Sequence, residues 1–154
     1  MKKVLVWIAS FLTVISFSGA LYAQERGTVD EAKKLAEKAA TYAKSAGTAK
    51  AFEEFSNKGA AWQSKDLYVF AIKFDGETVA HGANKGLIGK NLIEMKDANG
   101  KLFFKEMIDT AKEKGSGWVD YMFTDPTTKK IAPKTSYVIH VSGYDGLVGV
   151  GVYK

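Results

Sequence analysis

Lysine and tyrosine side chains lie close together near the end of the sequence, in stretches that are otherwise apolar. Lys134 precedes Tyr137 by three residues, and Tyr121 lies in the preceding apolar stretch. A lysine ammonium donates charge-assisted hydrogen bonds, and tyrosine hydroxyls orient a partner inside an apolar wall. This combination suits a small carboxylate with a short alkyl tail. The alternative for each tyrosine is plain core packing with a satisfied hydroxyl.

Three further residues are candidates for the same site. His81 ends an apolar stretch and begins a glycine-rich loop, a position from which it can donate to an anion at a pocket mouth. A solvated or structural histidine is the alternative interpretation. Trp118 and Met107 are candidates for the apolar wall. His140 alternates with apolar neighbours, and we expect it to face solvent.

The sequence lacks the patterns that support catalysis or metal binding. Its two histidines form no HxH or HExxH motif, and it contains no cysteine. No serine lies in a G-x-S-x-G motif. The loop at residues 86–91 resembles a phosphate loop, but Asn84 and Asn91 replace the required glycine and hydroxyl residue. We therefore expect no enzyme, no catalytic residue, no cofactor and no metal site.

Length and charge restrict the class of protein further. The chain has 154 residues, of which 46% are apolar, which fits one domain with a substantial core. The net charge is +5 for the whole chain and +3 without residues 1–23, which contain two lysines and no acid. The basic residues form no tract or stripe. The sequence therefore argues against a nucleic-acid partner.

The N-terminus has the pattern of an export signal. Lys2 and Lys3 precede an apolar stretch, and small residues lead to Ala23. We expect cleavage after Ala23, with Ala20 as the alternative, so that residues 24–154 form the exported domain. The other alternative is an uncleaved membrane anchor, because residues 4–23 are uncharged and long enough to span a bilayer. Either outcome places the domain outside the cytoplasm.

The first part of the domain is predicted to be helical. Thr28 and Glu31 form a capping-box pattern, in which each side chain satisfies a free backbone amide at the helix start. Apolar residues, mostly alanine, then recur at helical spacing, so this helix can lie close against its partner. Gly47 ends or kinks the helix. A shorter helical segment is predicted over residues 48–57.

The remaining chain predicts one antiparallel sheet. Residues 67–74 are apolar on both alternating sets of positions, so this strand belongs in the middle of the sheet. Asp75-Gly76 is a hairpin signal, and strand 78–81 returns from it. Further elements are expected as follows: a helical turn at 91–96, an amphipathic helix at 102–114, and strands at 118–123, 136–141 and 147–153, the last closing the sheet.

Four stretches of this sequence resemble the single Cache domain. They are DLYVFAIKFDGETVAHGANKGLIGKN at 66–91, GWVDYMF at 117–123, PKTSYV at 133–138 and VGVGVYK at 148–154. The single Cache domain is an extracytoplasmic, PAS-like sensor of bacterial chemoreceptors and sensor kinases. The resemblance implies an α+β fold, in which a long N-terminal helix packs on a five-stranded antiparallel sheet. A further helix lies between strands 2 and 3, and a ligand pocket lies on the other face.

The resemblance also implies a function. Similar domains bind short carboxylates with residues on these later strands, which points to Lys134, Tyr121 and Tyr137 as ligands of a small anionic metabolite. After the last strand the sequence shows no second membrane helix and no output domain. We therefore expect a free-standing periplasmic or secreted sensor, involved in signal transduction such as chemotaxis, that feeds a separate membrane receptor or sensor kinase. The alternative is a ligand-free accessory subunit of a membrane complex. An enzyme is a remote alternative.

Overall fold

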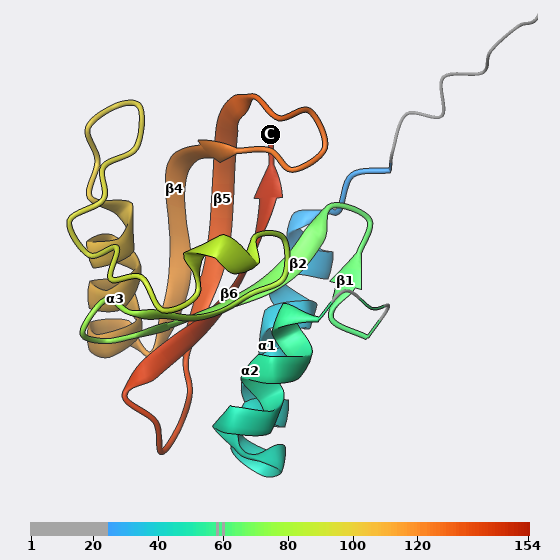
Figure 1. Cartoon of the computed structure of the whole chain (residues 1–154), viewed down its shortest axis with the longest axis vertical. Helices are drawn as coiled ribbons and strands as arrows, with labels where there is room; N and C mark the ends of the chain where they lie inside the picture. Colours follow the sequence, from blue (N-terminus) through green and yellow to red (C-terminus); the bar gives the residue numbers. More distant parts are fainter. Residues whose placement is uncertain (1–24, 58, 60) are drawn as a thin grey trace, which may run out of the picture.

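The structure, a computed structural model, describes residues 25–57, 59 and 61–154. Helices α1 (Val29–Ala46) and α2 (Thr48–Ser56) cover one face of an antiparallel sheet, and α3 (Phe103–Lys114) packs against the other face (Figure 1). Within the described residues, no helix is both long and apolar enough to span a bilayer. The export signal expected at residues 1–23 lies outside the described residues and stays a prediction.

The sheet has the order β1-β2-β6-β5-β4, and β3 also pairs with β2. All pairs are antiparallel. This confirms the α+β class, with the N-terminal helix on an antiparallel sheet, and adds one short strand, β1, that the sequence did not indicate. The strands are β1 (Gln63–Ser64), β2 (Leu67–Lys73), β3 (Thr78–His81), β4 (Ser116–Thr124), β5 (Ile131–His140) and β6 (Gly146–Tyr153).

Local sequence signals account for most element boundaries. The hydroxyl of Thr28 accepts from the backbone N–H of Glu31, and the Glu31 carboxylate accepts from the backbone N–H of Thr28, so the predicted capping box is present. Gly47, with φ of 87°, separates α1 from α2. The prediction of a helical turn at 91–96 is wrong. This segment is a turn, and the short 3-10 helix between β3 and α3 is η1 (Lys85–Leu87).

The last strand does not close the sheet at an edge but lies at its centre, between β2 and β5. All eight of its residues are buried, and so are six of the seven in β2. A strand covered on both faces must be apolar or small on both sets of alternating positions. In β6 one set contains Val148, Val150 and Val152, which pack under α1, and the other set includes Gly149 and Gly151.

The two glycines create room on the α3 side of the sheet. A Cβ at Gly149 would overlap the ring of Phe70, and a Cβ at Gly151 would overlap the Lys134 side chain and the Ser136 hydroxyl. Any larger residue would therefore displace these side chains. The glycine positions of β6 thus allow Phe70 and Lys134 to lie flat against the strand.

We expect the alanine stripe of α1 to set the distance between this helix and the sheet. Ala39 is fully buried, so Ala39→Leu should reduce the free energy of unfolding by about 1–3 kcal/mol through overpacking. Lys34→Leu, at an exposed position of the same helix, is the control and should change stability by less than about 0.5 kcal/mol. Urea denaturation of both variants measures the difference. Equal stability of the two variants would contradict this account of the packing.

Candidate functional site

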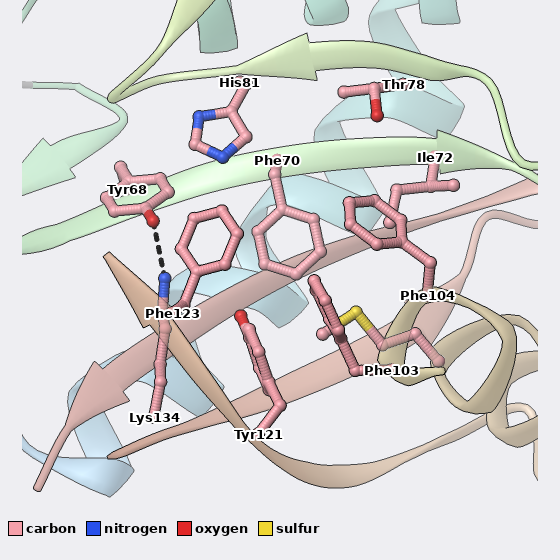
Figure 2. Close-up of a pocket in the computed structure, with 11 residues that line it drawn as sticks. Tyr68, Phe70, Ile72, Thr78, His81, Phe103, Phe104, Tyr121, Phe123 and Lys134 are labelled. Atoms are coloured by element: carbon pink, nitrogen blue, oxygen red, sulfur yellow. Dashed lines mark hydrogen bonds between the residues drawn. The ribbon is translucent and has the colours of Figure 1, made fainter. Parts of the chain in front are cut away.

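A lysine ammonium is buried on the α3 side of the sheet. Lys134 lies on β5 and its exposed fraction is 1%. Its Nζ donates to the hydroxyl oxygen of Tyr68 at 2.6 Å, as Figure 2 shows. In the described part of the chain it forms no ion pair with a carboxylate. A buried charge without a counter-charge is costly, so this position favours either loss of the proton or the arrival of an anion.

Aromatic rings surround the ammonium. Nζ lies 4.1 Å from the ring centre of Tyr68, 4.7 Å from that of Tyr153 and 5.6 Å from that of Phe123. The negative faces of such rings attract a cation and offset part of the desolvation cost. The Tyr153 hydroxyl donates to the carbonyl of Thr124 at 2.8 Å and lies 3.4 Å from the Tyr68 hydroxyl. The hydroxyl groups therefore help to hold Tyr68 on β2 and Tyr153 on β6 in place beside the ammonium.

Burial disfavours the charged form of Lys134. Burial lowers the pKa of its ammonium to about 7, and the charges of Asp66 and Asp125 oppose this shift. These two buried carboxylates are already paired with Arg26, whose guanidinium donates to Asp66 at 3.0 Å and to Asp125 at 2.7 Å. Their effect on Lys134 is therefore limited, and an anion placed beside Nζ would raise its pKa again.

Tyr121 stands directly opposite Lys134 in the β4–β5 register. Its hydroxyl shares a hydrogen bond of 2.9 Å with the hydroxyl of Ser136, and its ring stacks on Phe103 at 4.6 Å between centres. Burial raises the pKa of the Tyr121 hydroxyl. The group therefore keeps its proton, which it donates to Ser136 or, where Ser136 is the donor, can offer to another acceptor.

His81 is buried at the end of β3 and faces the same group of side chains. Its Nδ1 accepts from the backbone N–H of Asn84 at 3.0 Å. Burial and the nearby charge of Lys134 lower the pKa of the imidazole to about 3, so the ring is neutral at physiological pH. A neutral ring that accepts at Nδ1 carries its proton on Nε2, which makes Nε2 a donor.

These residues enclose a small cavity between the sheet and α3 (Figure 2). Its volume is about 10 Å³, the space for about one water molecule. Two kinds of side chain form it: apolar groups, mostly aromatic, and a few polar groups that converge from β2, β3, β4 and β5. The lining residues are Tyr68, Phe70, Ile72, Thr78, His81, Phe103, Phe104, Met107, Tyr121, Phe123 and Lys134.

The structure brings four of the six candidate residues together and places two elsewhere. Lys134, Tyr121, His81 and Met107 line the cavity. Tyr137 packs with the core under α1, where its hydroxyl donates to Ser116 at 3.0 Å. Because neighbouring strand residues alternate between faces, a residue three positions from Lys134 faces away from it.

Trp118 needs the same correction. It pairs with Tyr137 across β4 and β5 and is 37% exposed, so it contributes no wall to the cavity. The expectation that His140 faces solvent is confirmed, since it is exposed at the end of β5.

Sequence reasoning missed several residues of the site. The rings of Tyr68 and Tyr153 contact the Lys134 ammonium, and Thr78 and Phe123 line the cavity. One signal was present: Tyr68 shares an alternating set on its strand with Phe70 and Ile72, and all three line the cavity. The sequence showed this set as apolar but did not show that it faces Lys134 on a strand 66 residues later.

The comparison with known families decides what kind of domain this is. A family model described as single Cache domain 2 matches residues 3–154, nearly the whole chain. The chain belongs to the single Cache family. The resemblance expected from the sequence is therefore confirmed.

This Cache domain is similar to parts of signalling proteins. It is 35% identical over 89 residues to the sensor histidine kinase MctS of Rhizobium johnstonii, which covers 58% of this chain and 19% of the kinase. It is 28% identical over 88 residues to the methyl-accepting chemotaxis protein McpP of Pseudomonas putida, which covers 57% of this chain and 16% of that protein. The matched region is thus less than a fifth of either relative.

Solved structures show the same fold. A methyl-accepting chemotaxis protein from Vibrio parahaemolyticus matches with a TM-score of 0.69 and 25% identity, over 80% of this chain and 86% of that chain. A periplasmic sensor domain of a chemotaxis protein matches with a TM-score of 0.64 and 28% identity, over 80% and 88%. A Cache chemosensory domain described for its recognition of carboxylic acids matches with a TM-score of 0.68 and 24% identity, over 80% and 91%.

The geometry of Lys134 predicts an unusual titration. One lysine side chain should titrate with a midpoint near pH 7 instead of near 10.5, because its ammonium is desolvated and lacks a carboxylate partner. NMR of the lysine Cε and Hε resonances across the pH range measures this midpoint. The shifted resonance should be missing from Lys134→Met. A spectrum in which every lysine titrates near 10.5 would contradict the burial of an unpaired ammonium.

Proposed function

We propose that this protein is an extracytoplasmic sensor domain that binds a short carboxylate, with Lys134 as the cationic anchor. The observation that carries the proposal is the buried ammonium of Lys134. Its one hydrogen-bond partner in the described residues is the hydroxyl of Tyr68, a neutral group. A ligand carboxylate beside Nζ would supply the negative charge that the surrounding side chains do not.

The neighbouring polar groups suit the same ligand. Tyr121 keeps its hydroxyl proton because burial raises its pKa, and the neutral ring of His81 presents an Nε2–H. The Nε2–H of His81 can donate to a carboxylate, and the Tyr121 hydroxyl can do so when Ser136 is the donor in their shared hydrogen bond. Both residues line the cavity with Lys134. A carboxylate accepts up to four hydrogen bonds, so these donors can orient it while Lys134 neutralises it.

The apolar wall restricts the ligand to a small molecule. Phe103, Phe123 and Met107 fill most of the space beside the polar groups, and the cavity measures about 10 Å³. A carboxylate of two to four carbons is the size class that fits after modest side-chain movement, which is common at binding sites. The fold shared with a Cache domain that recognises carboxylic acids supports this choice of ligand.

The signalling context is also part of the proposal. The similar proteins are chemotaxis receptors and a sensor kinase, and the matched region is less than a fifth of MctS and of McpP. We infer that the protein acts in the periplasm or outside the cell, with residues 1–23 as its export signal. We further infer that it delivers the ligand signal to a separate membrane receptor or sensor kinase.

Removal of the ammonium should abolish tight binding without unfolding the protein. Acetate, propanoate and butanoate should raise the melting temperature of the wild type, because a ligand that binds only the folded state stabilises it. Lys134→Met keeps the length of the side chain and removes its charge. Since a hydrogen bond to a charged group contributes about 1.5–3 kcal/mol, calorimetry should show an affinity at least about tenfold lower.

Lys130→Met is the matched control, because Lys130 is exposed just before β5 begins. This variant should bind like the wild type. Binding that is equally tight to Lys134→Met would overturn the assignment of the anchor. The absence of binding by the wild type to every short carboxylate would overturn the proposed ligand class.

The affinity for a carboxylate should depend on pH around neutrality. The anion binds the charged form of Lys134, whose pKa in the free protein is about 7, so binding requires proton uptake at higher pH. Below about pH 6 Lys134 is charged, so its titration should not change the affinity there. Above about pH 8 the affinity should decrease by close to tenfold for each pH unit. His81, with a pKa of about 3, stays neutral over this range.

Calorimetry at pH 8 in buffers of different ionisation enthalpy measures the proton uptake directly. We expect close to one proton per bound ligand, and the same value for the Lys130→Met control. An affinity that does not change between pH 6 and pH 9 would argue that the bound anion does not pair with a titrating lysine.

A further inference from the structure

A network of three charged side chains lies next to the Lys134 site. Arg26 precedes α1, and its guanidinium donates to Asp66, in the turn before β2, and to Asp125, in the turn after β4. The two aspartates are 40 and 99 residues away from Arg26 in sequence. Their side chains are only 1% exposed, whereas that of Arg26 is 43% exposed. Two buried carboxylates therefore share one guanidinium.

The charges of this network do not balance. One guanidinium against two carboxylates leaves one buried negative charge. A buried charge is costly unless an opposite charge compensates it. Lys134 forms no ion pair with Asp66 or Asp125, but both carboxylates attract its ammonium and oppose the loss of its proton. Arg26 and Lys134 thus compete for the same two carboxylates.

One aromatic ring lies between the two cations. The Cζ atom of Arg26 is 5.8 Å from the ring centre of Tyr153, and the Nζ atom of Lys134 is 4.7 Å from it. The Tyr153 hydroxyl donates to the carbonyl of Thr124, the residue directly before Asp125. Because this region is buried, charges on either side of the ring are screened less than they would be in water.

Other charges near Lys134 have partners of their own. A surface depression on the β4 side of Lys134 contains two aspartates and two lysines, which are Asp97, Asp120, Lys101 and Lys154. Lys154 pairs with Asp120 at 3.0 Å, and Lys101 pairs with Glu106 at 2.8 Å. Asp97 accepts three backbone N–H groups. This depression therefore contributes little net charge to the site.

The remaining titratable groups around the ammonium are neutral. Burial lowers the pKa of the His81 imidazole and raises the pKa of the hydroxyls of Tyr68, Tyr121 and Tyr153. Beside Asp66, Lys65 pairs with Glu31 at 2.9 Å. The Arg26 network is therefore the charged group of the described residues that most affects Lys134.

We propose that Arg26 is a positioning residue for the ligand site, which holds Asp66 and Asp125 together and so leaves the Lys134 ammonium available to a ligand anion. This inference rests on the proposed function, because it takes Lys134 as the anchor. Arginine suits the role, since its planar fork of donors can bond two carboxylates at once. Without Arg26, two unpaired buried carboxylates would attract the ammonium and repel an incoming anion.

A titration without ligand tests this charge balance. The midpoint of Lys134, followed by lysine NMR, should rise by about one pH unit or more in Arg26→Met, because Lys134 is then the cation that the two carboxylates share. The double variant Arg26→Met and Asp125→Asn removes one charge of each sign, so its midpoint should return to within about half a unit of the wild type. Lys130→Met, which removes an exposed cation close to Asp125 in sequence, should leave the midpoint unchanged.

Calorimetry with propanoate measures the consequence for binding. At pH 6 Lys134 is mostly charged in the wild type and in Arg26→Met, so a difference in affinity reports competition by the carboxylates. Arg26→Met should bind about three- to tenfold more weakly, and the double variant should recover most of this loss. Above pH 8 the affinity of Arg26→Met should decrease less steeply than that of the wild type, because its Lys134 keeps the proton to higher pH.

Asp125→Asn decides the question if Arg26→Met does not fold. This variant leaves one carboxylate for one guanidinium, so the midpoint of Lys134 should fall below that of the wild type. A midpoint that does not move in Asp125→Asn, or that does not rise in folded Arg26→Met, would overturn the inference. Propanoate affinity equal to that of the wild type in folded Arg26→Met at pH 6 would overturn it as well.

The two measurements separate this inference from the proposed function. If the wild type binds propanoate through Lys134 but the midpoint does not depend on Arg26, only the role of Arg26 is rejected. If the midpoint moves as expected but no carboxylate binds the wild type, the proposed ligand class is rejected, and the control of the Lys134 charge by Arg26 is retained.

Discussion

The burial of the Lys134 ammonium is the constraint on which the rest of this structure depends. An ammonium away from water needs hydrogen-bond acceptors, aromatic rings or anions around it, and here the sheet supplies a tyrosine hydroxyl oxygen and three aromatic faces but no carboxylate. Gly151 on the neighbouring strand leaves space for the side chain. The site therefore retains a positive charge that the protein itself only partly compensates.

The architecture allows this arrangement because the C-terminal strand lies at the centre of the sheet. One face of β6 presents valines to the alanine-rich helix α1, and this face builds an ordinary apolar core. The other face presents glycines and Tyr153, and it builds the floor of the site. The core under α1 and the proposed ligand site thus lie on opposite faces of the same strand.

The sequence predicted local features well and long-range ones less well. The capping box at Thr28 and the central position of residues 67–74 followed from short patterns, and both are present. Tyr137 was assigned to the site because it is close to Lys134 in sequence, but alternation places it on the other face. A bulge at Val79 in β3 and the contact between Tyr68 and Lys134 depend on pairing between segments, which a single sequence does not specify.

A crystal structure of the protein grown with propanoate tests the central claim most directly. The account predicts one propanoate in the cavity between the sheet and α3, with a carboxylate oxygen within about 3 Å of Lys134 Nζ, the usual length of a charge-assisted hydrogen bond. The methyl end should point away from Tyr68. A propanoate bound elsewhere, or one whose carboxylate turns away from Lys134, would contradict the claim that the buried ammonium is the anchor of the ligand.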